Sequence, residues 1–114
     1  MNQLPIFVNL SGRKVILLGT GEMADAKRRL YERAGAVMVD DEDASDAALA
    51  VVALEDDEEA LAAVKRLKAR GLLVNAVDRS ALCDYTTPAL VDRDPVLIAI
   101  GTGGASAGLA KSLR

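Results

Sequence analysis

A glycine turn between an apolar run and an amphipathic run is the feature that most constrains how this chain can fold. The apolar run at residues 15–18 ends at Gly19, and a helical pattern begins after Glu22. Residues 19–24 read Gly-Thr-Gly-Glu-Met-Ala, the G-x-G-x-x-A pattern of a strand–turn–helix unit that binds a dinucleotide. In that pattern Gly19 allows the tight turn, Gly21 lets a pyrophosphate approach the backbone, and Ala24 lets the helix pack closely on the strand.

The residues of this turn are therefore the predicted cofactor contacts. Backbone N–H groups at the start of the helix face the bound anion, and the positive end of the helix dipole adds to the attraction. The alternative is a purely structural turn, because glycines also end strands where no ligand binds. The predicted contacts are Gly19, Thr20, Gly21, Glu22, Met23 and Ala24.

Composition narrows the class of protein. The 114 residues fit one domain, and 51% hydrophobic with 27% charged residues is typical of a globular chain. The net charge of −3 argues against nucleic acid and against an anionic membrane as partners. Cys83 is the single cysteine, which excludes an internal disulfide and favours the cytoplasm, and the absence of histidine argues against an N/S metal cage.

Apolar and amphipathic stretches alternate along most of the chain and predict parallel strands joined by helices. Strands are expected at residues 14–18, 36–39, 49–54 and 72–77. A first helix is expected at residues 22–34, and Asp56 with Glu59 resembles a capping box that opens a second. The predicted buried stripes are Met23, Ala26, Leu30 and Ala34 on the first helix, and Leu61, Val64 and Leu67 on the second.

The pattern changes in two places. Residues 40–48 are barely long enough for a crossover helix, so this half of the fold is predicted to be shortened. Residues 88–91 and 96–100 flank only four residues, which predicts an antiparallel hairpin. The predicted fold is α/β: a Rossmann-like, mostly parallel sheet flanked by helices, with a C-terminal antiparallel hairpin, forming a single NAD-binding domain over residues 1–114.

An acidic run follows the second predicted strand. Asp40 stands about 20 residues after the glycines, where such folds hold the adenosine ribose hydroxyls. A carboxylate there repels a 2′-phosphate, so the predicted cofactor is NAD rather than NADP. The alternative is that residues 40–43 form a solvated acidic loop.

Motifs distributed along the whole chain resemble the N-terminal domain of siroheme synthase, the precorrin-2 dehydrogenase/sirohydrochlorin ferrochelatase family. The matching segments are residues 4–7, 12–15, 19–22, 34–36, 74–78, 82–85, 88–93 and 103–106. The resemblance implies NAD-dependent oxidation of the tetrapyrrole precorrin-2 to sirohydrochlorin, and in many members Fe²⁺ insertion. It also implies a homodimer formed through a C-terminal helical region. A last predicted helix opens at residues 101–106 and reaches Arg114 without a stop signal, so that region is expected to be missing.

The resemblance assigns roles to further residues. It places the catalytic base at Asp78, which ends the fourth predicted strand; the alternative role of Asp78 is an Asx-turn acceptor for Arg79 and Ser80. A glycine-rich helix start near residue 103 could hold a substrate carboxylate, or be capped by its own serine. Lys27 and Arg28 are expected on a solvated helix face, the alternative being contact with substrate carboxylates. Cys83 is expected to be a small packed residue. The predicted substrate contacts are Asn75, Thr102, Gly103, Gly104 and Ser106.

The chain also departs from the family pattern. Residues 54–57 read Leu-Glu-Asp-Asp where the family has a Thr-Asp-Asp signature, and Ala107 stands where a proline is common. One rival reading is a nucleotide-sensing module like that of potassium-channel regulators, which shares the glycine turn and the acid but performs no chemistry. Another is a Rossmann remnant that has lost its affinity for the cofactor.

Overall fold

The computed structural model describes residues 1–101, which belong to two compact units. The larger unit is Val8–Thr86, and the smaller one combines Met1–Phe7 with the chain from Thr87 onward. Each unit is described by itself. No helix in the described part of the chain is both long enough and apolar enough to cross a membrane.

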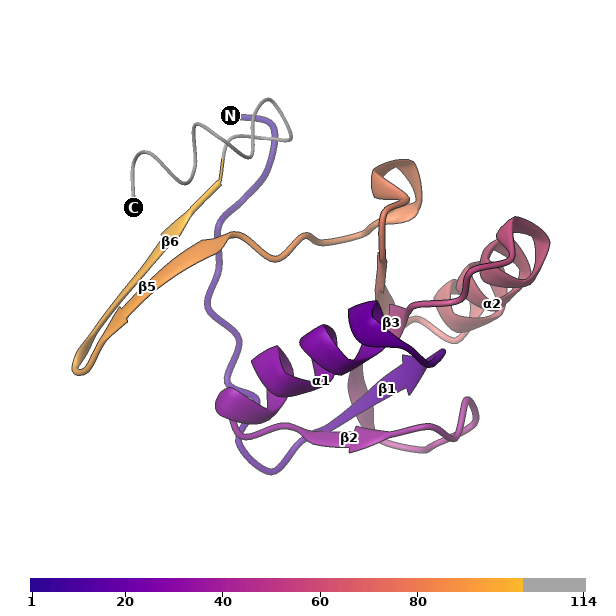
Figure 1. Cartoon of the computed structure of the whole chain (residues 1–114), viewed down its shortest axis with the longest axis horizontal. Coiled ribbons are helices and arrows are strands. Elements are labelled where there is room, and N and C mark those ends of the chain that lie inside the picture. The colour runs from indigo at the N-terminus through magenta and orange to yellow at the C-terminus, as the bar shows by residue number, and fades with distance from the viewer. Residues whose placement is uncertain (102–114) are drawn as a thin grey trace. The chain divides into compact units, whose positions relative to one another are not determined.

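The larger unit contains a parallel sheet with the strand order β2-β1-β3-β4. Figure 1 labels β1, β2 and β3 of this sheet. Its pairings are parallel throughout, which confirms the predicted Rossmann-like arrangement. The strands are β1 (Lys14–Leu18), β2 (Val37–Val39), β3 (Ala47–Val52) and β4 (Leu73–Ala76), with α1 (Glu22–Arg33), α2 (Asp57–Ala69) and the 3₁₀ turn η1 (Ser80–Leu82) between and after them.

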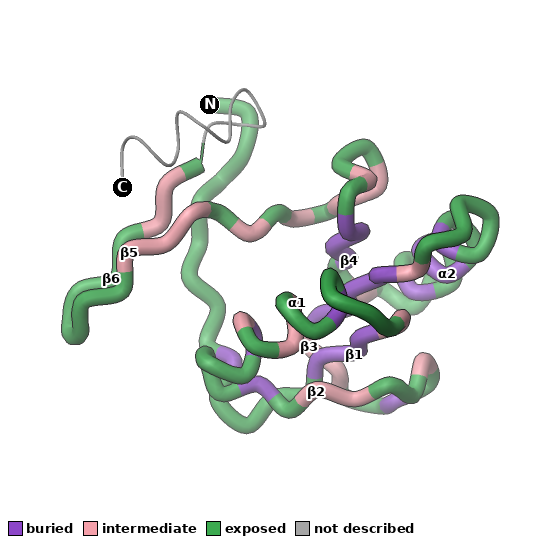
Figure 2. Tube along the Cα trace, in the orientation of Figure 1, coloured by how far each residue is buried: buried purple, intermediate pink, exposed green. Residues whose placement is uncertain are grey.

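The two helices cover opposite faces of this sheet. Val15 and Leu17 of β1 pack in one cluster with Ala24 and Tyr31 of α1. Ile16, on the other side of β1, packs with residues of α2. Successive side chains of a strand point to opposite faces, so both faces of β1 are covered. The middle of the strand, residues 15–17, is buried (Figure 2). Double coverage explains why this strand has a uniformly apolar sequence.

The rotation of each helix differs from the prediction. In α1 the buried residues are Ala24 and Tyr31. Leu30 is half-buried against the core, as predicted, whereas Met23, Ala26 and Ala34 are exposed, so the rest of the predicted stripe was wrong. Ala24 decides the rotation, because it lies against the sheet with an exposed fraction of only 2%. Lys27 and Arg28, three and four residues on from Ala24, are therefore half-buried rather than on a solvated face.

The second helix follows the prediction more closely. Asp56 caps α2 by accepting a hydrogen bond from the Glu59 backbone N–H at 2.9 Å, as the capping-box pattern predicts. The buried residues of α2 are Ala60, Ala63, Val64 and Leu67, whereas Leu61 is exposed, contrary to prediction. Alanine gives a weaker periodic signal than leucine, which is why Leu61 was wrongly placed in the core.

The β2–β3 connection contains no helix, which confirms that this half of the fold is shortened. Two arginines of α2 hold the connection in place. Arg66 binds both carboxylate oxygens of Glu42, at 2.7 and 2.9 Å, and this hydrogen-bonded contact lowers the pKa of Glu42. Arg70 donates to the carbonyl of Ala44 at 2.7 Å and also to the carbonyl of Glu42.

In the smaller unit, β5 (Ala89–Arg93) and β6 (Val96–Ile100) form the predicted antiparallel hairpin. Arg93 pairs with Val96, so the turn is two residues shorter than the predicted four-residue connection. The last predicted helix, opening at residues 101–106, falls almost entirely outside the described residues.

Replacing Gly19 by alanine tests the contact that fixes the glycine turn. A Cβ at Gly19 would lie 2.1 Å from the backbone oxygen of Ala53, and Gly19 has a φ of +115°. We expect Gly19→Ala to lower the free energy of unfolding by about 3 kcal/mol or more, because backbone must shift to relieve the clash. Urea unfolding measures the loss.

Gly12→Ala is the matched control. Gly12 also has a positive φ, +73°, but a Cβ there would meet nothing within 4 Å. Its expected cost is only about 1–2 kcal/mol, from backbone strain alone. Equal urea midpoints for the two variants would contradict the assigned role of the Gly19–Ala53 contact.

Candidate functional site

A pocket of about 440 Å³ lies at the carboxyl ends of the central strands. It is lined by residues 20–23 after β1, by residues 53–55 and Asp57 after β3, and by residues 77–79 after β4. The strand order β2-β1-β3-β4 changes direction between β1 and β3. Open α/β sheets bind their ligands at such a switch point, outside the carboxyl ends of the strands.

The two glycines of the turn have different roles. Gly19 is needed inside the fold, because the carbonyl of Ala53 occupies the place of a Cβ. Gly21 has a φ of +100°, and a Cβ there would meet nothing within 4 Å, so open space lies beside it. Gly21 is also the N-cap of α1 and provides no side-chain cap. The start of this helix is thus suited to an anionic group of a ligand.

Asp78 is exposed in the pocket and follows directly after the end of β4. Its backbone has a φ of 59°, the left-handed region that aspartate adopts more readily than most residues. The Asx-turn role is not observed: the Arg79 N–H donates instead to the carbonyl of Ala76, at 3.1 Å. Among the described residues the Asp78 carboxylate has no hydrogen-bonding partner, so it is available to a ligand.

Arg79 was missed by the sequence reasoning. Its guanidinium donates to the carbonyls of Leu54 at 2.9 Å and Glu55 at 3.0 Å, and to the carboxylate of Asp57 at 2.7 Å. These contacts join the segment after β4 to the segment after β3. The sequence around Arg79 gives no indication that its side chain contacts residues so distant in the sequence.

Asn75 is buried in β4, with an exposed fraction of 5%. Its Nδ2 donates to the Tyr85 carbonyl at 3.0 Å and lies 3.8 Å from the sulfur of Cys83. Its Oδ1 has no hydrogen-bond partner among the described residues. A buried acceptor without a partner costs about 1–3 kcal/mol. An N–H donor from a ligand would remove that cost.

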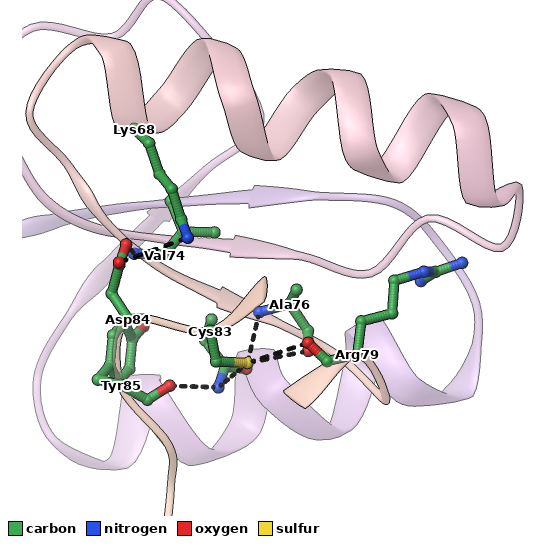
Figure 3. Close-up of polar contacts among 8 residues, drawn as sticks. Lys68, Val74, Ala76, Arg79, Cys83, Asp84 and Tyr85 are labelled. Atoms are coloured by element: carbon green, nitrogen blue, oxygen red, sulfur yellow. Dashed lines mark hydrogen bonds and ion pairs between the residues drawn. The ribbon is translucent and has the colours of Figure 1, made fainter. Parts of the chain in front are cut away.

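Cys83 and Asp84, both labelled in Figure 3, contact the backbone at the edge of β4. The Cys83 sulfur lies 3.2 Å from both the backbone nitrogen and the carbonyl oxygen of Ala76. Asp84 accepts a hydrogen bond from the Val74 N–H at 2.9 Å and pairs with Lys68 at 3.5 Å. Cys83 is therefore a packed residue that caps a strand edge, as expected from the sequence.

A polar cluster lies under α1 on the same side of the sheet as Asn75. The hydroxyls of Tyr31 and Tyr85 are hydrogen-bonded at 2.7 Å. Burial raises the pKa of Tyr31 to about 12 and also raises the pKa of Tyr85, so both are neutral at physiological pH. Burial lowers the pKa of Lys27, while the nearby Cys83 and Asp78 act in the opposite direction.

The predicted site residues are only partly brought together. Thr20, Gly21, Glu22, Met23 and Asp78 line the pocket, whereas Gly19 and Ala24 shape the turn behind it. Asp40 is exposed after β2 and does not line the pocket, and Asn75 is buried within β4. Thr102, Gly103, Gly104 and Ser106 lie outside the described residues. The pocket residues that were not predicted are Ala53, Leu54, Glu55, Asp57, Val77 and Arg79.

Some of the pocket residues that were not predicted could have been inferred from where the third strand ends. Residues 53–57 come directly after a buried parallel strand, where ligands bind in such sheets.

Within residues 1–101 no three His, Cys, Asp or Glu side chains are grouped so that they could hold a metal ion.

The fold and the pocket define an α/β unit of the dinucleotide-binding class. The chain belongs to the putative NAD(P)-binding family, whose family model matches residues 31–89. It is similar to siroheme synthases, which confirms the resemblance seen in the motifs. It is 35% identical to the siroheme synthase of Methylobacillus flagellatus and 36% identical to that of Azotobacter vinelandii.

These alignments include the whole of this chain but only 30% of each relative. They extend over 140 positions against the 114 residues of this chain, so the relatives carry segments without a counterpart here. A solved structure of SirC, a precorrin-2 dehydrogenase, has the same fold, with a TM-score of 0.74 and 24% identity. That similarity covers 97% of this chain and 67% of the SirC chain.

Because burial raises the pKa values of Tyr31 and Tyr85, we expect the folded protein to lose stability in alkaline solution. The pKa of Tyr31 is near 10 in an unfolded chain and about 12 in the folded one. The unfolded state therefore ionises first as the pH rises, and stability is lost between these two values, by on the order of 2 kcal/mol. Thermal unfolding from pH 8 to pH 11.5 measures this loss.

Tyr31→Phe is the variant that tests this assignment. It removes one of the two titrating hydroxyls, so the decline of stability with pH should become shallower while the stability at pH 8 changes by only about 1 kcal/mol. An unchanged decline with pH would contradict the role given to Tyr31.

Proposed function

We propose that this chain forms the dinucleotide-binding part of an enzyme that oxidises precorrin-2 to sirohydrochlorin with NAD. The observation that carries the proposal is the exposed Asp78 carboxylate in a pocket that the open Gly21 turn also lines. The similarity to siroheme synthases and the fold of SirC support this choice of substrate. The sensing-module alternative is not favoured, because the relatives that match are named for siroheme synthesis.

The residues present fit a nicotinamide dinucleotide. The uncapped start of α1 suits the pyrophosphate, and the space beside Gly21 leaves room for it. Asp40, exposed at the end of β2, is our candidate for holding the adenosine ribose hydroxyls and for excluding NADP. When bound, NAD supplies the acceptor for a hydride from the reduced tetrapyrrole.

The protein groups supply position and a base. Oxidation of precorrin-2 removes a hydride and a proton, and the Asp78 carboxylate accepts the proton in this proposal. Asn75 has no part in this step, because it is buried within β4 and does not line the pocket. The Fe²⁺ insertion and the homodimer implied by the resemblance are not needed for this step.

Asp78→Asn tests the base. Asparagine has nearly the same shape and tolerates the left-handed backbone at this position, so the fold and the affinity for NAD should be retained. Turnover should fall at least about 100-fold, because the amide cannot accept the proton. The measurement is anaerobic incubation with precorrin-2 and NAD⁺, followed by sirohydrochlorin absorbance. A rate equal to that of the unaltered protein would exclude Asp78 as the base.

Asp40→Asn tests the cofactor preference. If Asp40 holds the ribose hydroxyls, the variant should bind NAD less tightly and discriminate less against NADP, by about 10-fold in the ratio of the two affinities. Calorimetric titrations with both dinucleotides measure this ratio.

Asp43→Asn is the matched control, an exposed acid three residues away in the same run. It should leave the ratio unchanged. Equal effects of the two variants would mean that the acidic run acts only as a diffuse negative charge.

A further inference from the structure

The side chain of Arg79 joins two walls of the pocket that lie far apart in the sequence. One wall is the segment after β3, where Leu54 and Glu55 offer their backbone carbonyls and Asp57 its carboxylate. The other is the turn after β4, in which Arg79 directly follows Asp78. The guanidinium spans the two walls with three hydrogen bonds of 2.7–3.0 Å.

The bonds to the carbonyls are the ones that matter most. The Arg79 side chain exposes only 19% of its surface, whereas the Asp57 side chain exposes 94%. A carboxylate so exposed remains solvated and contributes little as an ion-pair partner. The planar guanidinium, by contrast, presents fixed donors that can reach two successive carbonyls at once.

Arg79 also adjoins a strained position. Asp78 has a φ of 59°, and a non-glycine residue stays in this region when its surroundings hold it there. On one side Val77 is tied to β3 by its N–H bond to the Val52 carbonyl, at 2.9 Å. On the other side the Arg79 N–H bonds to Ala76 at 3.1 Å and its side chain bonds to the opposite wall.

We propose that Arg79 is a positioning residue, whose guanidinium holds residues 54–57 against the turn that carries Asp78. It thereby sets the width of the dinucleotide pocket and the position of the Asp78 carboxylate. The ligand in this proposal rests on the proposed function, whereas the ordering of the two walls does not. In this role Arg79 acts through the two pocket walls that its side chain joins.

The first test uses the protein without any ligand. Amide hydrogen exchange of residues 53–57 and 77–80 is compared between the unaltered chain, Arg79→Ala and Arg79→Lys. Loss of the bridge should speed exchange in both segments at least tenfold in Arg79→Ala. Arg79→Lys should give an intermediate effect, because one ammonium group cannot reach both carbonyls, and it also serves if the alanine variant fails to fold.

Lys68→Ala is the matched control. Lys68 also links α2 to the chain after β4, through its pair with Asp84 at 3.5 Å. Asp84, however, bonds to Val74 near the amino end of β4, away from the pocket. This variant should leave exchange in residues 53–57 and 77–80 unchanged.

The second test measures NAD⁺ affinity by calorimetry and turnover of precorrin-2. Arg79→Ala should weaken NAD⁺ binding at least tenfold and lower kcat, at a temperature where circular dichroism shows it folded, while Lys68→Ala changes neither. Unchanged exchange in Arg79→Ala would overturn the proposal, and so would faster exchange with unchanged NAD⁺ affinity and kcat. If the unaltered protein binds no dinucleotide, the proposed function fails, while hydrogen exchange still decides whether Arg79 orders the two walls.

Discussion

The close contact between Gly19 and the carbonyl of Ala53 is the constraint on which the site depends. It lies where β1 and β3 end side by side, next to the hydrogen bond from Ala53 to Leu18 at 2.7 Å. Only glycine leaves space for that carbonyl. The contact sets the path of the chain into α1 and also fixes the start of the opposite wall at residue 53. The turn that would hold a cofactor and the wall that faces it therefore share one point of support.

Arginine side chains hold two of the segments between helices and strands in place. Arg66 and Arg70 hold the helix-free β2–β3 connection against α2, through Glu42 and the carbonyl of Ala44. Arg79 holds the segment after β3 against the turn after β4. Irregular segments leave carbonyls without regular partners, and a guanidinium can satisfy several of them at once. A short chain can in this way keep its loops defined without additional helices.

Much of the fold follows from local patterns. The order of the strands, the capped start of α2, the shortened β2–β3 connection and the presence of the hairpin agree with the sequence-based expectation. The strand β3, however, begins and ends two residues before the predicted strand at residues 49–54. The rotation of α1 does not, because two stripes of its sequence contain apolar residues, and only the contact of Ala24 with the sheet selects between them. That selection buries Tyr31 and brings Lys27 toward the sheet, which the charge pattern of the helix does not indicate.

The sequence by itself determined the order of the elements, the glycine turn and the position of Asp78 at a strand end, since each depends on residues that are neighbours along the chain. Tertiary structure alone decided that Arg79 bonds to Leu54, 25 residues away, and that Oδ1 of Asn75 is buried without a partner among the described residues. Such contacts depend on how strands pair and how helices rotate on the sheet. The local periodicity of the sequence determines neither the pairing of the strands nor the rotation of the helices, because both are fixed only when the core packs.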